Sequence, residues 1–188
     1  MTIFTIGHST RPIEDFIALL RAHGVKRLVD IRTIPRSRAN PQYGRGALGR
    51  ALRNRRIAYT YRKELGGLRR AAKDSPNAAW RNPSFRGYAD YMQTPEFEHA
   101  LDDLLELDGP IAIMCAEAVP WRCHRSLVAD ALVAREVPVA HIMSATRANP
   151  HELTSFAKVR RRRVTYPAAA APPGPASAPA PRRSRARR

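Results

Sequence analysis

Short apolar runs that alternate with amphipathic stretches constrain the fold of this chain more than any other feature. The clearest run, Ile111-Ala-Ile-Met-Cys115, contains no charged residue and has the length of a buried strand. Further runs of strand length lie at residues 2–6, 27–32, 57–61 and 137–143. This alternation predicts one α/β domain at residues 1–157, with a largely parallel sheet and flanking helices.

The stretches between these runs carry apolar residues at helical spacing. Pro12 suits the first turn of a helix that ends at His23-Gly24, and Thr94-Pro95 begins another that ends at Gly109. Residues 62–83 are rich in Gly, Pro and Arg, so we expect them to be irregular. Further helices are expected at 46–56, at 84–93, from Pro120 onward, and at 149–157.

The charge is unevenly distributed along the 188 residues, in which 33 Lys and Arg against 16 Asp and Glu give a net charge of +17. Residues 32–86 hold fifteen basic and two acidic residues, whereas residues 87–157 hold four basic and eleven acidic ones. Residues 158–188 hold ten basic residues, no acidic residue and many Ala and Pro. They have too little apolar surface to offset the entropy of ordering, which predicts a disordered basic tail. This tail either contacts phosphates non-specifically or is a solvated extension of biased composition.

Membrane and secreted proteins have features that this sequence lacks. No apolar run approaches the roughly 20 residues that a membrane-spanning helix needs. The first residues lack the basic region and long apolar stretch of a signal peptide. Two cysteines form at most one disulfide, and nothing else indicates an oxidising compartment. We therefore expect a cytoplasmic protein.

Polar and reactive residues follow several of the predicted strands. The carboxyl ends of parallel strands meet at one edge of an α/β sheet, where ligands bind. An imidazole, two carboxylates, a thiol and several guanidinium groups are therefore expected to converge there. The residues concerned are His8, Asp30, Arg32, Arg36, Arg38, Cys115, Glu117, Trp121, Arg122, His124, Arg125 and Ser126.

Several interpretations are open for Cys115 and Cys123-His124. A thiolate just before a helix and near arginines has a lowered pKa and acts as a nucleophile. A phosphatase-type loop is disfavoured, because it would place Arg122 one residue closer to Cys115. The spacing matches neither a common zinc pattern nor the redox Cys-x-x-Cys motif, so no metal site is predicted. Alternatively, Cys115 ends a buried strand as a small hydrophobic residue and Cys123 packs on the apolar face of a helix.

The arginines at this edge favour anion binding. Guanidinium groups and the backbone amides of a helix start bind phosphate, which predicts an anion site made by Arg32, Arg36, Arg38, Arg122, Arg125 and Ser126. Alternatively, these arginines form salt bridges with Asp30 or Glu117 that hold the edge of the sheet together.

Three of the residues are candidates for catalysis. Glu117 is the preferred general base and Cys115 the nucleophile, while His8 either exchanges protons beside a bound anion or caps the next helix. Asp30 either orients an arginine or acts as a base, because a charge inside a strand needs a partner. Trp121 and His124 are assigned supporting roles.

The basic segment and the residues just after it also hold aromatic rings. Arginines interleaved with aromatic rings contact phosphates and stack on bases, which favours nucleotide or nucleic-acid binding. Alternatively, half of the rings belong to the core and the arginines form a solvated face. The rings are those of Tyr43, Tyr59, Tyr61, Trp80, Phe85, Tyr88 and Tyr91.

Separate motifs occur in order along residues 2–145. They are Ile6-Gly-His-Ser-Thr10, Leu28-Val-Asp-Ile-Arg32 with Pro35 and Ser37-Arg38, Leu65-Gly-Gly67, Gly87-Tyr-Ala-Asp-Tyr-Met92, and Met114-Cys-Ala-Glu117 with Trp121-Arg-Cys-His-Arg125. In these motifs the chain resembles the domain of unknown function 488 family. The resemblance implies a compact α/β domain, widespread in prokaryotes, whose site is formed by the motif residues. It implies no reaction, because the family is uncharacterised.

The sequence thus supports an enzyme, or enzyme-like domain, that acts on a phosphorylated small molecule or a nucleic acid. Arginines would hold the anion, and Cys115, Glu117 or His8 would carry out the chemistry. The alternative is a non-catalytic nucleic-acid-binding protein that uses residues 32–86 and the tail, and a thiol-dependent redox role is a third hypothesis. Neither a cofactor nor an oligomeric state follows from the sequence.

Overall fold

The computed structural model describes residues 2–169, in which the alternating runs form a mixed sheet of six strands. The strand order is β3-β2-β4-β1-β5-β6, and every neighbouring pair is parallel except β5 and β6. The α/β prediction with a largely parallel sheet is therefore confirmed. The strands are β1 (Ile3–Gly7), β2 (Arg27–Asp30), β3 (Ala58–Tyr61), β4 (Ile111–Cys115), β5 (Val139–Ile142) and β6 (Ala148–Pro150).

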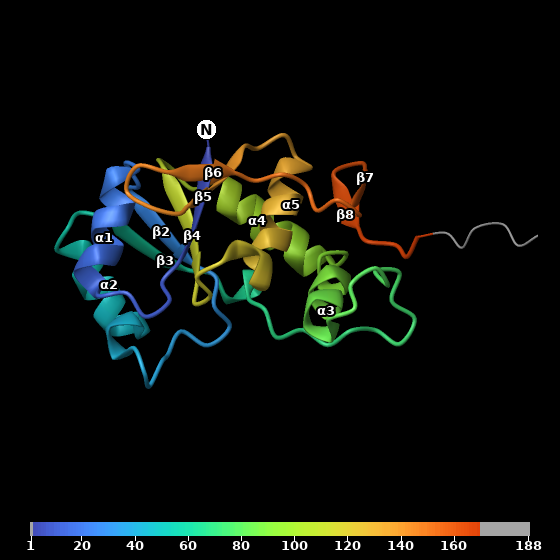
Figure 1. The fold of residues 1–188 in the computed structure, drawn as a ribbon, viewed down its shortest axis with the longest axis horizontal. Helices are drawn as coiled ribbons and strands as arrows, with labels where there is room; N and C mark the ends of the chain where they lie inside the picture. Colours follow the sequence, from blue (N-terminus) through green and yellow to red (C-terminus); the bar gives the residue numbers. More distant parts are fainter. Residues whose placement is uncertain (1, 170–188) are drawn as a thin grey trace, which may run out of the picture.

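Helices cover both faces of this sheet (Figure 1). Phe16 and Leu48 pack with Leu28 on one face, whereas Leu101 packs with Val29 on the other. Neighbouring residues of β2 point to opposite faces, so each face of the strand contributes to a separate apolar cluster. The helices are α1 (Ile13–Ala22) and α2 (Arg45–Arg53) on the first face, and α3 (Pro83–Tyr91), α4 (Pro95–Leu105) and α5 (Arg125–Val133) on the second.

The uncharged run forms β4, which lies between β2 and β1 in the sheet. All five of its residues are buried, which explains why a charge is absent. The register pairs Gly7 with Cys115 and Asp30 with Met114. Residues that follow these three strands therefore meet at one edge of the sheet.

The structure corrects two of the predicted helices. Residues 149–157 form no helix, because Ala148–Pro150 pairs with β5 as strand β6 and the chain then continues without regular structure. The helix expected from Pro120 begins later, at Arg125, after a separate 3₁₀ turn at Pro120–Arg122. Cys123 and His124 therefore precede the helix instead of lying inside it.

The first residues of the predicted disordered tail are ordered. Strands β7 (Lys158–Arg160) and β8 (Arg163–Thr165) form a hairpin, and the ring of Tyr166 is fully buried. Sequence composition missed this hairpin because its arginines surround two apolar residues, Val164 and Tyr166, that dock into the core. The rest of the predicted tail, residues 170–188, lies outside the described residues. Within residues 2–169, no helix has the length and apolar character required to cross a membrane.

The buried carboxylate of Asp130 in α5 anchors this C-terminal segment. It accepts hydrogen bonds from the Tyr166 hydroxyl at 2.7 Å, the Thr154 hydroxyl at 2.7 Å and Nε2 of His151 at 2.8 Å. Nδ1 of His151 lies 2.9 Å from Nε2 of His141. Burial, followed by the charge of His151, lowers the pKa of His141 to about 4.

Candidate functional site

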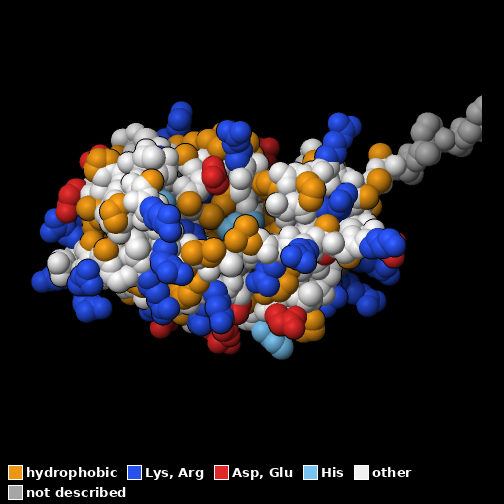
Figure 2. Space-filling model, turned by 90° about the horizontal axis from the view of Figure 1, so that it is seen from below, with side chains coloured by type: hydrophobic (Ala, Val, Ile, Leu, Met, Phe, Trp, Pro, Cys, Tyr) orange, Lys and Arg blue, Asp and Glu red, His pale blue; other side chains and the backbone are white. Residues whose placement is uncertain are grey.

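A pocket of about 540 Å³ lies at the carboxyl ends of β1, β2 and β4, at the lower edge of the sheet in Figure 1. Figure 2 looks onto this face, where Lys and Arg side chains surround a hollow in which histidine atoms are visible. The structure thus brings six of the predicted site residues to one cavity. These residues are His8, Arg32, Arg36, Cys115, Glu117 and His124.

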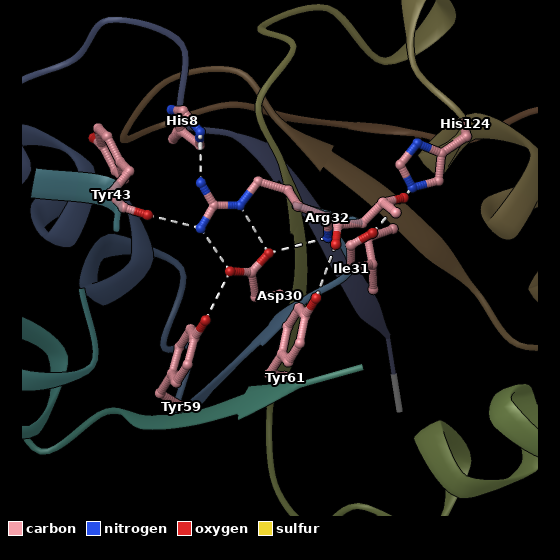
Figure 3. A network of polar contacts seen from close by, with 9 residues as sticks. His8, Asp30, Ile31, Arg32, Tyr43, Tyr59, Tyr61 and His124 are labelled. Carbon is pink, nitrogen blue, oxygen red and sulfur yellow. Dashed lines mark hydrogen bonds and ion pairs between the residues drawn. The ribbon is translucent and has the colours of Figure 1, made fainter. Parts of the chain in front are cut away.

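Asp30 and Arg32 form a buried ion pair at the wall of the pocket (Figure 3). Nε and Nη2 of Arg32 donate to the two carboxylate oxygens at 2.9 and 2.6 Å. Nη2 also donates to the Tyr43 carbonyl at 2.8 Å, and the Tyr59 hydroxyl donates to the carboxylate at 2.7 Å. Asp30 therefore orients an arginine, as in the alternative in which Arg32 forms a salt bridge with Asp30. Arg32 also lines the pocket, and its binding of an external anion stays a prediction.

His8 completes what we term the arginine network, formed with Asp30, Arg32, Tyr43 and Tyr59. A guanidinium group only donates, so Nε2 of His8 accepts from Nη1 of Arg32 at 3.2 Å. Nδ1 then carries the proton and donates to the Ser9 carbonyl at 2.7 Å. Burial, followed by the charge of Arg32, lowers the pKa of His8 against the opposing effect of the Ser9 hydrogen bond. Both ring nitrogens of His8 therefore have partners within the protein, and its predicted role in proton exchange stays a prediction.

The guanidinium group of Arg125 is also hydrogen-bonded within the protein. It is 1% exposed, and its Nη groups donate to the backbone carbonyls of Glu117 and Ala118, the latter at 2.8 Å. The hydroxyl of Ser126 donates to the Cys123 carbonyl at 3.0 Å. These contacts fix the loop after β4 and favour an internal role for Arg125 and Ser126, whose predicted anion binding stays a prediction.

Cys115, Cys123 and His124 form a second group, which we term the thiol cluster. Nδ1 of His124 lies 3.9 Å from Sγ of Cys115 and 3.8 Å from Sγ of Cys123. Nε2 of the same ring donates to the Ile31 carbonyl at 3.2 Å (Figure 3). In the neutral ring, Nδ1 therefore presents its lone pair to both sulfur atoms. Both thiols are free and buried, and Cys115 reaches the wall of the pocket.

The two thiols differ in acidity because they contact each other. A hydrogen bond from Cys123 is the largest effect on Cys115 and, with His124 and the charge of Arg125, lowers its pKa well below the ordinary value despite burial. The same hydrogen bond and burial raise the pKa of Cys123. Cys115 is therefore the more acidic thiol of the pair.

A family can be assigned from this chain's central region. The sequence profile described as Domain of unknown function DUF488 matches residues 12–132. The chain belongs to the DUF488 family. The match includes the thiol cluster and Asp30–Arg32, whereas His8 and the rest of the Ile6–Thr10 motif precede it. No curated protein and no solved structure matches the chain.

The remaining predicted site residues of this DUF488 protein line different cavities or none. Arg36 lines the main pocket, while Arg122 lines an adjoining cavity of about 170 Å³ together with Cys115 and Glu117. Arg38 is exposed and is not part of either lining. Trp121 is 66% exposed and lines a different pocket near His141 and His151. Two exposed arginines, Arg36 and Arg122, thus flank Cys115 from separate cavities.

Most of the aromatic rings predicted to stack on bases have internal partners. Tyr43 and Tyr88 are buried in the core, and Tyr59 belongs to the arginine network. The guanidinium groups of Arg45 and Arg69 lie over the rings of Tyr61 and Tyr91 at 4.7 and 3.6 Å. The alternative interpretation, in which about half of the rings are core, agrees with these contacts.

Backbone conformation marks two pocket residues that were not among the individually predicted site residues. Ser9 belongs to the Ile6–Thr10 motif, whereas Leu68 lies outside every motif. Ser9 and Leu68 line the pocket with positive φ angles of 50° and 59°, which are costly for residues other than glycine. Leu68 is also 74% exposed at the mouth of the pocket. The preceding Gly67 lies against His124, since a Cβ there would meet Nδ1 at 2.9 Å. The Leu65-Gly-Gly67 motif was the available signal, because paired glycines permit such a close approach.

Proposed function

We propose that this DUF488 protein is an enzyme that acts on an anionic substrate, a phosphorylated small molecule or a nucleic acid, in the pocket at the strand ends. The observation that supports this most directly is that a thiol, an imidazole and a carboxyl group, those of Cys115, His124 and Glu117, line one open pocket. Groups that serve packing alone do not need access to a cavity. Cys115 at the end of β4 and Glu117 two residues later in the following loop are the groups from which the chemistry proceeds.

The anion is held by arginines whose side chains have no hydrogen-bond or ion-pair partner within residues 2–169. Arg36 on one side and Arg122 on the other are both exposed and both line cavities that Cys115 also lines. Ser37 and Asn40 add polar groups to the wall beside Arg36. Arg32 and Arg125 shape the walls instead, because their guanidinium groups are bonded within the protein. The two free thiols fit a reducing compartment, and we propose the cytoplasm.

Ligand binding tests the anionic substrate class. Inorganic phosphate, nucleoside mono- and diphosphates and a single-stranded oligonucleotide are offered in turn, and thermal shift reports binding to the folded state. Arg36→Ala should weaken the binding of the active ligand about tenfold or more, as expected for one lost charge-assisted hydrogen bond. Arg53→Ala is the matched control, since Arg53 is an exposed arginine of the same basic segment on α2. Equal effects of the two substitutions, or no shift with any ligand, would contradict the proposal.

The second candidate function is non-catalytic nucleic-acid binding by residues 32–86 and the tail. Its support is that Arg36 and Arg53 are exposed in this segment. Such binding weakens steeply with salt and does not depend on Cys115 or Glu117. Turnover of a bound oligonucleotide or nucleotide that Cys115→Ser and Glu117→Gln abolish, with binding retained, would identify the enzyme. Binding without turnover, unaffected by both substitutions, would identify the alternative.

A further inference from the structure

We infer that Cys115, Cys123 and His124 form a binding site for a divalent metal ion of the zinc type, with one coordination position open to the pocket. The inference deepens the proposed function, on which it rests for the ion's role, whereas binding of the ion is independent of any substrate. Cys115 then acts as a ligand and not as a free nucleophile.

The donor atoms already have the spacing that a shared ion requires. The two sulfur atoms and Nδ1 of His124 all lie within 4.8 Å of one another, and the two sulfur–nitrogen distances are 3.9 and 3.8 Å. Around a tetrahedral zinc ion, with bonds of about 2.0–2.3 Å, sulfur and nitrogen ligands lie about 3.5–3.8 Å apart. Coordination therefore requires the sulfur–nitrogen distances to shorten by a few tenths of an ångström. The two sulfur atoms, now within 4.8 Å of each other, must lie about 3.8 Å apart, a shift of at most about 1 Å.

The orientation of the imidazole fits a ligand better than a catalytic base. Nε2 of His124 donates to the Ile31 carbonyl at 3.2 Å, which fixes the tautomer and leaves the lone pair of Nδ1 toward the sulfur atoms. A metal-bound histidine has this same arrangement, with its second nitrogen donating to a backbone carbonyl or carboxylate. Gly67 packs against the ring, which holds its plane in place.

Chemistry selects the class of ion. Two thiolates and one imidazole are soft and borderline ligands that favour zinc over magnesium or calcium, which prefer oxygen. Two thiolates also neutralise a dication, so the loaded site adds no net charge to this buried position. The sequence spacing did not predict such a site. The connection from β4 to α5, which contains the 3₁₀ turn Pro120–Arg122, brings Cys123 and His124 back to Cys115.

The cavities around the thiol cluster indicate an open site. All three residues line the cavity of about 170 Å³, and Cys115 and His124 also line the main pocket. A structural zinc ion has four protein ligands in a closed shell, whereas a catalytic one has three and binds water or substrate in the fourth position. Three donors beside an open cavity match the second type. The ion would therefore face the groups proposed to bind the anion.

Metal titration of the untagged, reduced full-length protein tests this inference. We expect one Co²⁺ per chain, with a thiolate-to-cobalt charge-transfer band and the strong visible bands of four-coordinate cobalt. One equivalent of Zn²⁺ should displace the cobalt and protect both cysteines from a thiol reagent. Cys115→Ser, Cys123→Ser and His124→Ala should each weaken Zn²⁺ binding by more than about 100-fold, which exceeds the loss seen when only an outer-shell partner is removed. His99→Ala, an exposed histidine on α4, is the matched control and should bind normally.

Two results would overturn the inference. One is that Zn²⁺ leaves the reactivity of both thiols unchanged, a measurement on the wild-type chain that does not depend on how the variants fold. The other is that folded ligand variants bind as tightly as wild type, which would place the ion elsewhere. Failure of the proposed function is separable, because it appears as loss of phosphate or oligonucleotide binding while the cobalt spectrum persists. Failure of the metal site alone leaves the Arg36-dependent ligand binding intact.

Discussion

The arginine network and the thiol cluster lie at the same edge of one sheet, yet their polar atoms are used in opposite ways. In the arginine network both oxygens of Asp30 and all three nitrogens of the Arg32 guanidinium have partners at 2.6–3.2 Å. In the thiol cluster Nδ1 of His124 lies 3.9 and 3.8 Å from the two sulfur atoms, and the three residues border an open cavity. A saturated network stabilises the fold, whereas an unsaturated cluster has capacity for a ligand.

An arginine at a predicted site is available to a ligand only when its guanidinium group has no partner within the protein. Arg32 and Arg36 are close in sequence and chemically identical, but a buried carboxylate occupies the first and solvent surrounds the second. Residue type alone made both equal candidates for anion binding. If this difference is real, substitutions in the arginine network should mainly reduce stability, whereas substitutions in the thiol cluster should mainly reduce ligand binding.

Asp30→Asn should be the most damaging substitution. It keeps the shape of the side chain but leaves the guanidinium of Arg32, which is 5% exposed, without its counter-charge. Removal of one partner of a buried pair costs about 3–5 kcal/mol of unfolding free energy, which urea denaturation measures. The control is the double variant Asp30→Asn with Arg32→Met, which removes both charges and should recover part of the loss. A double variant less stable than the single one would contradict this account.

Lowering the pH should have the second-largest effect on the free energy of unfolding, through protonation of the buried His141. The unfolded chain protonates His141 below about pH 6.5, whereas the folded protein does so only near a pKa of about 4. More protons are then bound by the unfolded state, so stability falls as the pH decreases from about 6.5 to 4, by up to about 3 kcal/mol. The lowered pKa of His8 acts in the same direction. His141→Gln should have a shallower dependence on pH in urea denaturation, and an unchanged slope would show that His141 does not contribute.

The sequence was a good guide to the parts of this fold that depend on local pattern. The uncharged run at Ile111–Cys115 and the alternation around it were sufficient to predict the sheet. Because ligands bind at the carboxyl ends of parallel strands, the sequence also predicted that Cys115, Glu117 and His124 lie close together, and the three residues line one pocket. The helix at 149–157 was predicted wrongly because pairing of Ala148–Pro150 with β5 outweighs helical spacing. The partners of Arg32 and Arg125 were beyond sequence reasoning, since they depend on which buried oxygens lie within reach in the folded chain.

Gly67→Ala tests the support of the thiol cluster. The new Cβ would meet Nδ1 of His124 at 2.9 Å, which forces the ring to move and should cost about 1–3 kcal/mol, as overpacking does. The same displacement should weaken Zn²⁺ binding, because the ring is the ligand. Gly49→Ala is the matched control, since its Cβ would lie at an ordinary 3.6 Å from Tyr59 within α2. That change should stabilise the protein by about 0.5–1 kcal/mol, because alanine favours a helix. Equal destabilisation by both substitutions would contradict the close packing at His124.

Cys115→Ser should have the smallest effect on stability and so separates the two groups most sharply. With a chelator present, the thiol of Cys115 contributes only weak sulfur hydrogen bonds, with Cys123 and with Nδ1 of His124 at 3.9 Å, so the variant should unfold within about 1 kcal/mol of wild type. With Zn²⁺ in excess, the wild-type Tm should rise because the ion binds only the folded state, while the variant Tm should stay constant. If Cys115→Ser instead destabilised the metal-free protein as much as Asp30→Asn does, the thiol cluster would itself be scaffold. The arginine network and the thiol cluster would then not differ in function, and Cys115 would stabilise the fold instead of serving the proposed chemistry.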